Sequence, residues 1–406
     1  MASQEIETRE MLQGTGYASA EELLESLGAG GDGNWEPGLE PWPEQALHRR
    51  LRKFAAGVTP AAHQVSFLGA GAGDHYLPAA VEAVGGFPSD DGEVERLGNR
   101  FARRIEALTR LPKAVPQVLT LLEAVCFLAN VIRGNLPNKR VVCLAGSLPP
   151  ALSARMQGIL RRNGLSCRMI PFENGVIPAA SIRAQLDPQV AAVILASPNF
   201  MGGIEPMVEI GEVVRQAQAL FVSVVTPLSL ALLRSPGEYG ADLCLGDLRS
   251  LGLSDRTTGE AWFAAVDDPS ASWFPARDGA GALRRVVAFL DTVGGRGLRH
   301  YAMASFKNAH FLQKAICQIA GFEAAHTAPF FNEFVIRTPV PADHLAGELE
   351  EQGIIAGLAL SRVGGQRDHL LVAATEMRTH DEVEYFLRAL KQLRDRHSGR
   401  GLGVDF

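Results

Sequence analysis

One short stretch of the chain gathers most of the side chains that could do chemistry. Asp74, His75 and Tyr76 follow a run of alternating glycine and alanine in "FLGAGAGDHYLP", and a helix-like sequence comes next. Three interpretations are open for it. It could be a phosphate-cradling loop, a catalytic loop, or only the tight start of a helix.

The glycine spacing argues against nucleotide binding. Gly69, Gly71 and Gly73 run G-x-G-x-G, whereas a dinucleotide fingerprint needs G-x-G-x-x-G after a strand. A P-loop also needs Lys and then Ser or Thr after its last glycine, and this chain has Asp74 and His75 there. On residue types alone, the glycines predict a close approach of the backbone to a packed surface.

Composition limits the class of protein. The chain has 406 residues, of which 47% are apolar and 21% charged, with a net charge of -6. We expect a globular protein with neither a nucleic-acid partner nor a membrane span, because both charge signs are mixed and the apolar runs are short. The five cysteines are dispersed without a C-x-x-C motif, and the first residues lack an apolar core. These features predict a cytoplasmic protein with reduced thiols.

Hydrophobic periodicity predicts alternating strands and helices in the middle of the chain. Such alternation favours a mainly parallel sheet with covered faces, and the last hundred residues read as a compact α+β unit. The predicted helices are 6–27 (two stretches), 44–55, 93–111, 118–133, 150–163, 209–217, 283–319, 341–352 and 381–396. The predicted strands are 140–145, 166–170, 191–196, 220–225, 243–245, 262–266, 333–337, 355–360 and 369–374.

This order of elements predicts three parts. They are a helical N-terminal arm (1–66), a large α/β domain (67–296) and a smaller C-terminal α+β domain (297–406). The layout matches that of fold type I pyridoxal-phosphate enzymes.

Five sequence blocks, in order, then point to one family. The chain resembles subunit 1 of glycine decarboxylase, the P-protein of the glycine cleavage system in its two-gene form. The first block has Gly73 where that subunit usually has Tyr. The blocks are "FLGAGAGDHYLP" (67–78), "SPNFMGGIEP" (197–206), "SPGEYGADLCLGDLRSLGL" (235–253), "AHFLQKA" (309–315) and "PFFNEFVIRTP" (329–339).

The resemblance raises the question of whether this chain holds the cofactor itself. Pyridoxal phosphate needs a Lys for its Schiff base and an acid beside its pyridinium nitrogen. Ser250 stands roughly where the lysine falls in the cofactor-bearing subunit, and Ser223 lies on the strand that should carry the acid. We therefore expect no cofactor on this chain. Lys307 and Lys314 lie on one face of a predicted helix and are expected in solvent.

The resemblance implies an assembly in which a homologous second subunit carries pyridoxal phosphate. Two copies of each chain would form a heterotetramer that decarboxylates glycine and passes the aminomethyl group to a lipoyl carrier, the H-protein. In such an assembly Gly69, Gly71, Gly73 and Asp74 lie near the subunit contact, and His75 or Tyr76 reaches or supports the shared site.

Each of these residues also has a plain structural explanation. Asp74 could cap the helix that starts at Tyr76 or Leu77, with His75 hydrogen-bonded locally. Asn199 follows a strand end, where α/β proteins bind ligands, but a turn explains it equally well. In "FFNEF", we expect Asn332 and Glu333 to begin a strand that buries Phe334 and Ile336 alternately with exposed neighbours.

Two departures mark the chain as a divergent member. The family's "YTPYQ…SQG" and "DGATA" elements are not recognisable between residues 86 and 116, and "DDPSASWFPARDGAGALRRVV" replaces the family's stretch after residue 266. Three functions remain open: a non-catalytic subunit of a glycine decarboxylase, the same subunit recruited to a specialised amino-acid-modifying pathway, or a free-standing pseudoenzyme scaffold.

Overall fold

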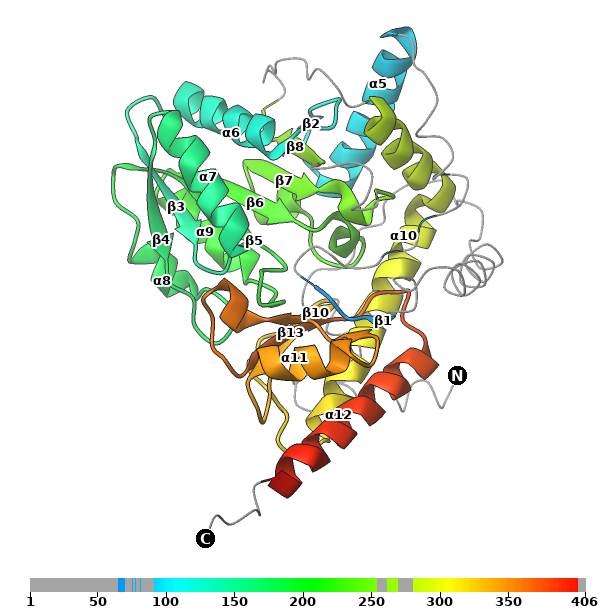
Figure 1. Ribbon diagram of the computed structural model, residues 1–406. Coiled ribbons are helices and arrows are strands. Elements are labelled where there is room, and N and C mark those ends of the chain that lie inside the picture. Colours follow the sequence, from blue (N-terminus) through cyan, green and yellow to red (C-terminus); the bar gives the residue numbers. More distant parts are fainter. Residues whose placement is uncertain are drawn as a thin grey trace.

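The computed structural model describes residues 65–69, 75, 77, 81, 91–253, 261–268 and 280–400. Gly71, Gly73, Asp74, Tyr76 and the helices predicted within 6–27 and 44–55 lie outside these residues. A seven-stranded sheet forms the centre of the described part (Figure 1). Its strands, in spatial order, are β2 (Lys113–Ala114), β8 (Trp262–Val266), β7 (Leu243–Asp247), β6 (Leu220–Val225), β5 (Val190–Ala196), β3 (Val141–Ala145) and β4 (Ser166–Ile170).

Five neighbouring strands of this sheet, from β7 to β4, are parallel, whereas β8 and β2 run antiparallel to their neighbours. The inner parallel strands β3, β5, β6 and β7 are mostly apolar and buried, as expected of strands covered on both faces, whereas the edge strand β4 is partly exposed. All seven residues of β5, "VAAVILA", are buried. The expected mainly parallel sheet is confirmed.

Helices surround the sheet in pairs that pack on one another. In Figure 1, α6 and α7 lie side by side, with α6 against β8 and α7 against β4, and α5 and the long helix α10 lie side by side, with α5 against β2. The predicted helix 118–133 begins later, because Thr120 and Glu123 form a capping box at its start. The helices are α5 (Asp91–Thr109), α6 (Leu121–Asn135), α7 (Pro150–Arg162), α8 (Ala179–Arg183), α9 (Met207–Gln216) and α10 (Ala280–Cys317).

The C-terminal unit is built on an antiparallel sheet that packs against the second half of α10. Its order is β12-β13-β10-β9, and helices α11 and α12 cover it. A separate two-stranded parallel pair joins β1 to β11. The elements are β1 (Val65–Ser66), β9 (Glu323–Ala324), β10 (Glu333–Arg337), α11 (Ala342–Glu350), β11 (Ile354–Ile355), β12 (Leu358–Ala359), β13 (His369–Ala373) and α12 (His380–Arg400).

The single strand predicted over 355–360 is wrong. The segment divides into β11 and β12, which belong to different sheets. Gly357 lies between them with a φ of 141°, a conformation that favours glycine. A Cβ at this position would lie 2.2 Å from the carbonyl oxygen of Leu371, so the turn also depends on a close backbone approach.

The start of the described chain is anchored in the C-terminal unit. The ring of Phe67 stacks on that of Phe386 with centroids 4.4 Å apart, and both are buried in the same apolar core. Helix α10 runs through residue 296 from the large sheet to the C-terminal unit, with a non-helical residue at Gly294. The three-part division stays a prediction. Among the described residues, no helix is long and apolar enough to cross a membrane.

Candidate functional site

The parallel strands bring four loops to one edge of the sheet. Strands β3, β5, β6 and β7 end at this edge, so the segments that follow them lie together. Open α/β sheets bind ligands there, and it is where the resemblance places a cofactor. Ser223 lies on β6, and Ser250 lies directly after β7.

Ser223 is fully buried on β6, and its hydroxyl already has a hydrogen-bond partner. Its Oγ lies 2.7 Å from the hydroxyl of Tyr239, at the end of the 3-10 helix η3 (Pro236–Tyr239). Burial raises the pKa of the Tyr239 phenol, which therefore stays protonated and can donate to the serine. A neutral serine offers no negative charge to a pyridinium nitrogen.

Ser250 closes the 3-10 helix η4 (Leu248–Ser250), directly after β7. It is buried, and its Oγ has no hydrogen-bond partner among the described residues. Asp247 at the end of β7 caps this turn by accepting from the Arg249 backbone N–H at 3.0 Å, and it also accepts from Arg249 Nε at 2.7 Å. Asp247, the acid nearest to Ser250 in the sequence, is therefore already paired with Arg249.

No lysine among the described residues stands at this edge. Lys113 pairs with Val266, at the opposite end of the sheet, and Lys139 Nζ donates to the carbonyl oxygen of Gln218 at 2.7 Å. Lys307, Lys314 and Lys391 are exposed on helices; exposure of the first two was expected and is confirmed.

The helix after β3 begins with two prolines, which reduces the number of backbone donors at its start. Pro149 is the N-cap of α7 and Pro150 its first residue, so neither offers an N–H group. With no lysine at this edge and no acid on β6, the described residues there do not fit pyridoxal phosphate bound as a Schiff base.

Asn199 organises the loop after β5 rather than an open pocket. Its Oδ1 accepts from the backbone N–H groups of Met201 at 2.9 Å and Gly203 at 3.0 Å. Its Nδ2 donates to the Gly175 carbonyl and to Glu205 Oε1, both at 2.7 Å. The turn interpretation therefore accounts for all of its polar atoms, and a catalytic contribution stays a prediction.

Glu205 is the buried carboxylate of this loop. Besides Asn199, it accepts from the Ser147 hydroxyl at 2.9 Å and from the Ile177 backbone N–H at 2.7 Å. Burial raises its pKa, and the three donors act in the opposite direction. The sequence offered no signal that this acid, within "SPNFMGGIEP", would join three loops.

The same loop covers one face of the C-terminal sheet, which corrects the expected alternation in "FFNEF". Phe334 and Ile336 are buried as predicted, but so is Val335, at 3% exposure. Val335 packs with Leu371 against Phe200 of the β5 loop. The strand is therefore buried on both faces.

His75 joins the first sequence block to the C-terminal unit. Its Nδ1 lies 3.2 Å from Oε2 of Glu376, in the segment after β13, and this carboxylate also accepts from the Ser305 hydroxyl of α10 at 2.8 Å. The side chains of His75 and Glu376 are 16% and 2% exposed. His75 is thus partly buried and hydrogen-bonded, but to a residue 301 positions away, so the local hydrogen bond of the structural explanation is not the contact observed.

Gly69 makes a close approach within its own chain. A Cβ on this residue would lie 2.6 Å from Glu333 Oε2 and 3.2 Å from the Ala373 Cβ. Among the glycines of this block the structure describes only Gly69, and its role in a subunit contact stays a prediction.

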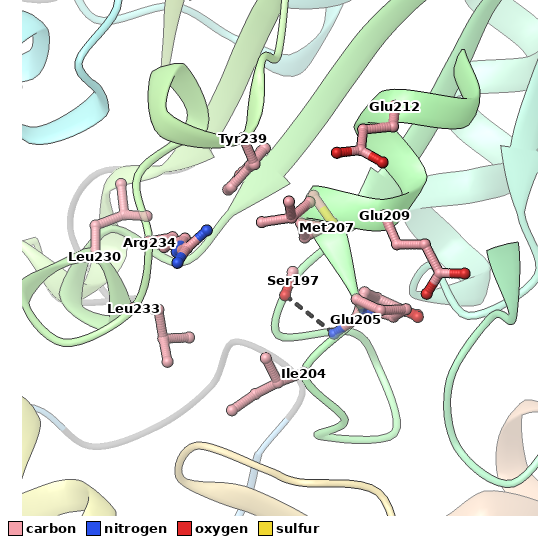
Figure 2. Close-up of a pocket in the computed structure, with 12 residues that line it drawn as sticks. Ser197, Ile204, Glu205, Met207, Glu209, Glu212, Leu230, Leu233, Arg234 and Tyr239 are labelled. Carbon is pink, nitrogen blue, oxygen red and sulfur yellow. Dashed lines mark hydrogen bonds between the residues drawn. The ribbon is translucent and has the colours of Figure 1, made fainter. Parts of the chain in front are cut away.

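A cavity of about 410 Å³ opens beside the loop after β5. It lies between that loop, the first turns of α9 and the segment after β6, and its walls are mostly apolar. Figure 2 shows Arg234 on one side and Glu209 and Glu212 on the other. No motif in the sequence indicated this cavity, because its lining comes from separate segments: Ser197, Ile204, Glu205, Pro206, Met207, Val208, Glu209, Glu212, Leu230, Leu233, Arg234 and Tyr239.

The sheet and the C-terminal α+β unit define the fold of type I pyridoxal-phosphate enzymes. A NifS-like protein (12% identity, TM-score 0.65, covering 82% of this chain and 99% of that one) and a sphingosine-1-phosphate lyase from Burkholderia pseudomallei (16%, 0.69, 90% and 94%) share it. At these identities the likeness concerns the fold alone.

More specific matches lie within one family. A family model described as "Glycine cleavage system P-protein" matches residues 156–277. "Probable glycine dehydrogenase (decarboxylating) subunit 1" of Chlorobium chlorochromatii is 29% identical over 97% of this chain and 99% of its own length. Its counterpart in Geobacillus thermodenitrificans is 28% identical over 95% and 97%.

A solved structure agrees with these relatives. The crystal structure of glycine decarboxylase (P-protein) of the glycine cleavage system, in inhibitor-bound form, is 26% identical, with a TM-score of 0.72, over 96% of this chain and 98% of that one. The resemblance inferred from the five blocks is confirmed: over nearly its full length this chain is a divergent homologue of glycine dehydrogenase (decarboxylating) subunit 1.

Proposed function

We propose that this chain is a cofactor-less subunit of a cytoplasmic glycine-decarboxylase-like complex. Its partner is a homologous subunit that carries pyridoxal phosphate, and two copies of each chain form a heterotetramer. The complex decarboxylates glycine or a related amino acid and transfers the aminomethyl group to a lipoyl carrier, the H-protein. This chain completes the wall of the shared site.

One observation carries the proposal. At the sheet edge where the cofactor would sit, the two positions that need a lysine and an acid hold Ser250 and Ser223, and Ser223 is hydrogen-bonded to Tyr239. The resemblance to proteins named subunit 1 supports a partner that supplies these groups.

The cofactor experiment uses the purified chain alone and then with its partner. After pyridoxal phosphate is added and the unbound cofactor is removed, the chain alone should show no stable Schiff-base absorbance, and borohydride should then attach no cofactor to its lysines. The lysine-bearing partner, treated in the same way, is the positive control. A borohydride-trapped adduct on any of the six lysines of this chain would refute the cofactor-less role.

Assembly supplies an independent experiment. Co-expression with a homologous lysine-bearing subunit should give a complex that copurifies, with two of each chain. If the chain is a monodisperse monomer that binds no such subunit, the result would favour a free-standing pseudoenzyme instead.

A specialised pathway is the second candidate. The replaced stretch after Val266 and the unrecognisable elements between residues 86 and 116 favour it, because the resemblance places both near the partner's site. Carbon exchange by the purified complex, assayed with glycine and with substituted amino acids, separates the two candidates. Activity restricted to a substrate other than glycine would select the second.

A further inference from the structure

A cluster of two histidines and a glutamate joins α11 to the last turns of α12. His344 and Glu348 lie four residues apart on α11, and His397 comes from α12. The two helices contact one another, and α12 extends away from the seven-stranded sheet (Figure 1). The cluster is therefore separate from the sheet edge described above.

The distances within the cluster suit one small cation. Oε1 of Glu348 lies 3.2 Å from Nδ1 of His344 and 3.0 Å from Nε2 of His397. All three potential ligand atoms are within 4.8 Å of one another. Bonds of about 2.0–2.2 Å at tetrahedral angles place neighbouring zinc ligands about 3.3–3.6 Å apart, so small side-chain rotations suffice.

The donor types select the kind of cation. Two imidazoles and one carboxylate are ligands that Zn²⁺ accepts, whereas Mg²⁺ and Ca²⁺ need oxygen-rich shells. The site is half open: the side chains of His344, Glu348 and His397 are 58%, 25% and 18% exposed. Water can therefore complete the shell. We propose that His344, Glu348 and His397 form a binding site for Zn²⁺ or a similar borderline divalent cation.

The surrounding contacts hold the two helices in place before an ion binds. Tyr385 of α12 donates its hydroxyl to the carbonyl of Gln352, just beyond α11, at 2.8 Å. The Gln352 side chain donates in turn to the Glu348 carbonyl at 3.2 Å. An ion that replaces the imidazole protons facing Glu348 links α11 to the end of α12 and stabilises the folded C-terminal unit.

The experiment measures binding of Zn²⁺ alone to the purified full chain by competition with a chromophoric chelator. We expect one site per chain in the wild type and an affinity at least about tenfold weaker in His344→Ala and His397→Ala, because loss of a ligand should cost no less than loss of an outer-shell partner. Zn²⁺ should also raise the unfolding temperature of the wild type and not that of the two variants.

The chain contains a matched control. His380 and Glu384 on α12 have the same four-residue spacing and a 3.2 Å contact, but they belong to no three-ligand cluster among the described residues. His380→Ala should bind Zn²⁺ like the wild type, and so should Cys317→Ser, which removes the exposed thiol. The proposal is overturned if the wild type takes up no Zn²⁺, or if the His344 and His397 variants bind it as tightly as the wild type.

Discussion

His75 lies 3.2 Å, Nδ1 to Oε2, from the buried carboxylate of Glu376, 301 positions further along the chain. Helix α10 takes part in this contact, because Ser305 donates to the same oxygen. The contact joins the first sequence block to the C-terminal unit. A residue that only shaped the local chain would need no such partner.

This contact predicts energetic coupling. In a double-mutant cycle, His75→Ala and Glu376→Gln should show a coupling free energy of about 0.5–3 kcal/mol, because the two groups share a partly buried hydrogen bond. Urea unfolding of the four proteins measures it. His75→Ala combined with Glu123→Gln, which alters only the α6 cap, should be additive within about 0.5 kcal/mol. An additive His75 and Glu376 pair would contradict the structure.

The same variant tests the proposed role in the shared site. His75→Ala should reduce turnover of the assembled complex by a larger factor than it weakens assembly, because small displacements in a reacting geometry are costly. Decarboxylation rates and subunit affinity are measured on one preparation, with Ser305→Ala as the control for the lost Glu376 contact. Unchanged turnover would reduce His75 to a structural residue.

At Gly202 the backbone lies so close to that of Glu333 that there is no space for a side chain. The φ of Gly202 is 85°, and a Cβ would lie 1.9 Å from the carbonyl oxygen of Glu333. Gly202→Ala should therefore lower the free energy of unfolding by more than about 2 kcal/mol. Gly134→Ala, on an exposed position of α6 with nothing within 4 Å, should instead raise it by about 0.5–1 kcal/mol. Equal effects in denaturant titrations would exclude the close approach.

The strands that hold the sheet together were predictable, because local sequence decides them. The segments 166–170, 220–225 and 333–337 match β4, β6 and β10 residue for residue, and a proline follows each of them within two residues. The short strands β2 and β9 and the helix α8 escaped prediction. With only two or five residues each, they depend on neighbours that the rest of the chain brings to them.

Part of the candidate site could likewise be predicted from the sequence, and part could not. The absence of a lysine and an acid at Ser250 and Ser223 can be read from residue types once the family's spacing is known. The partners of His75 and Glu205 cannot, because Glu376 and Ser147 lie far away in the sequence and meet them only through the packing of separate loops. Periodicity carries no information on such contacts.

Replacing the Glu205 carboxylate by an amide should lower the free energy of unfolding. In Glu205→Gln, the new NH₂ group must face either the Ile177 N–H or the Asn199 Nδ2, both of which are donors. We expect a loss of about 1–3 kcal/mol in unfolding free energy. Glu209→Gln, exposed on the neighbouring helix α9, should stay within about 0.5 kcal/mol of the wild type. A Glu205 variant as stable as the Glu209 variant would show that the carboxylate is not needed to join these loops.

His310 should make folding stability depend on pH. Its ring lies between those of Phe306 and Phe330, with both centroid distances 3.9 Å, and Nδ1 donates to the Phe306 carbonyl at 2.9 Å. Burial lowers the pKa of His310 from 6.5 to about 4. Between these values the unfolded chain binds a proton that the folded chain does not. Stability from this group is therefore complete above pH 6.5 and is lost as the pH falls towards 4, by up to about 3 kcal/mol.

Comparison of two variants isolates this effect from other titrating groups. His310→Leu should lose most of the dependence of unfolding free energy on pH between 4 and 6.5. Leu312→Ala removes a buried, non-titrating side chain of the same helix, so it should lower stability at every pH and keep the wild-type slope. The measurement is urea unfolding at half-unit steps of pH. If His310→Leu keeps the wild-type slope as Leu312→Ala does, the imidazole is not buried in its neutral form, and the packing between Phe306 and Phe330 would have to be revised.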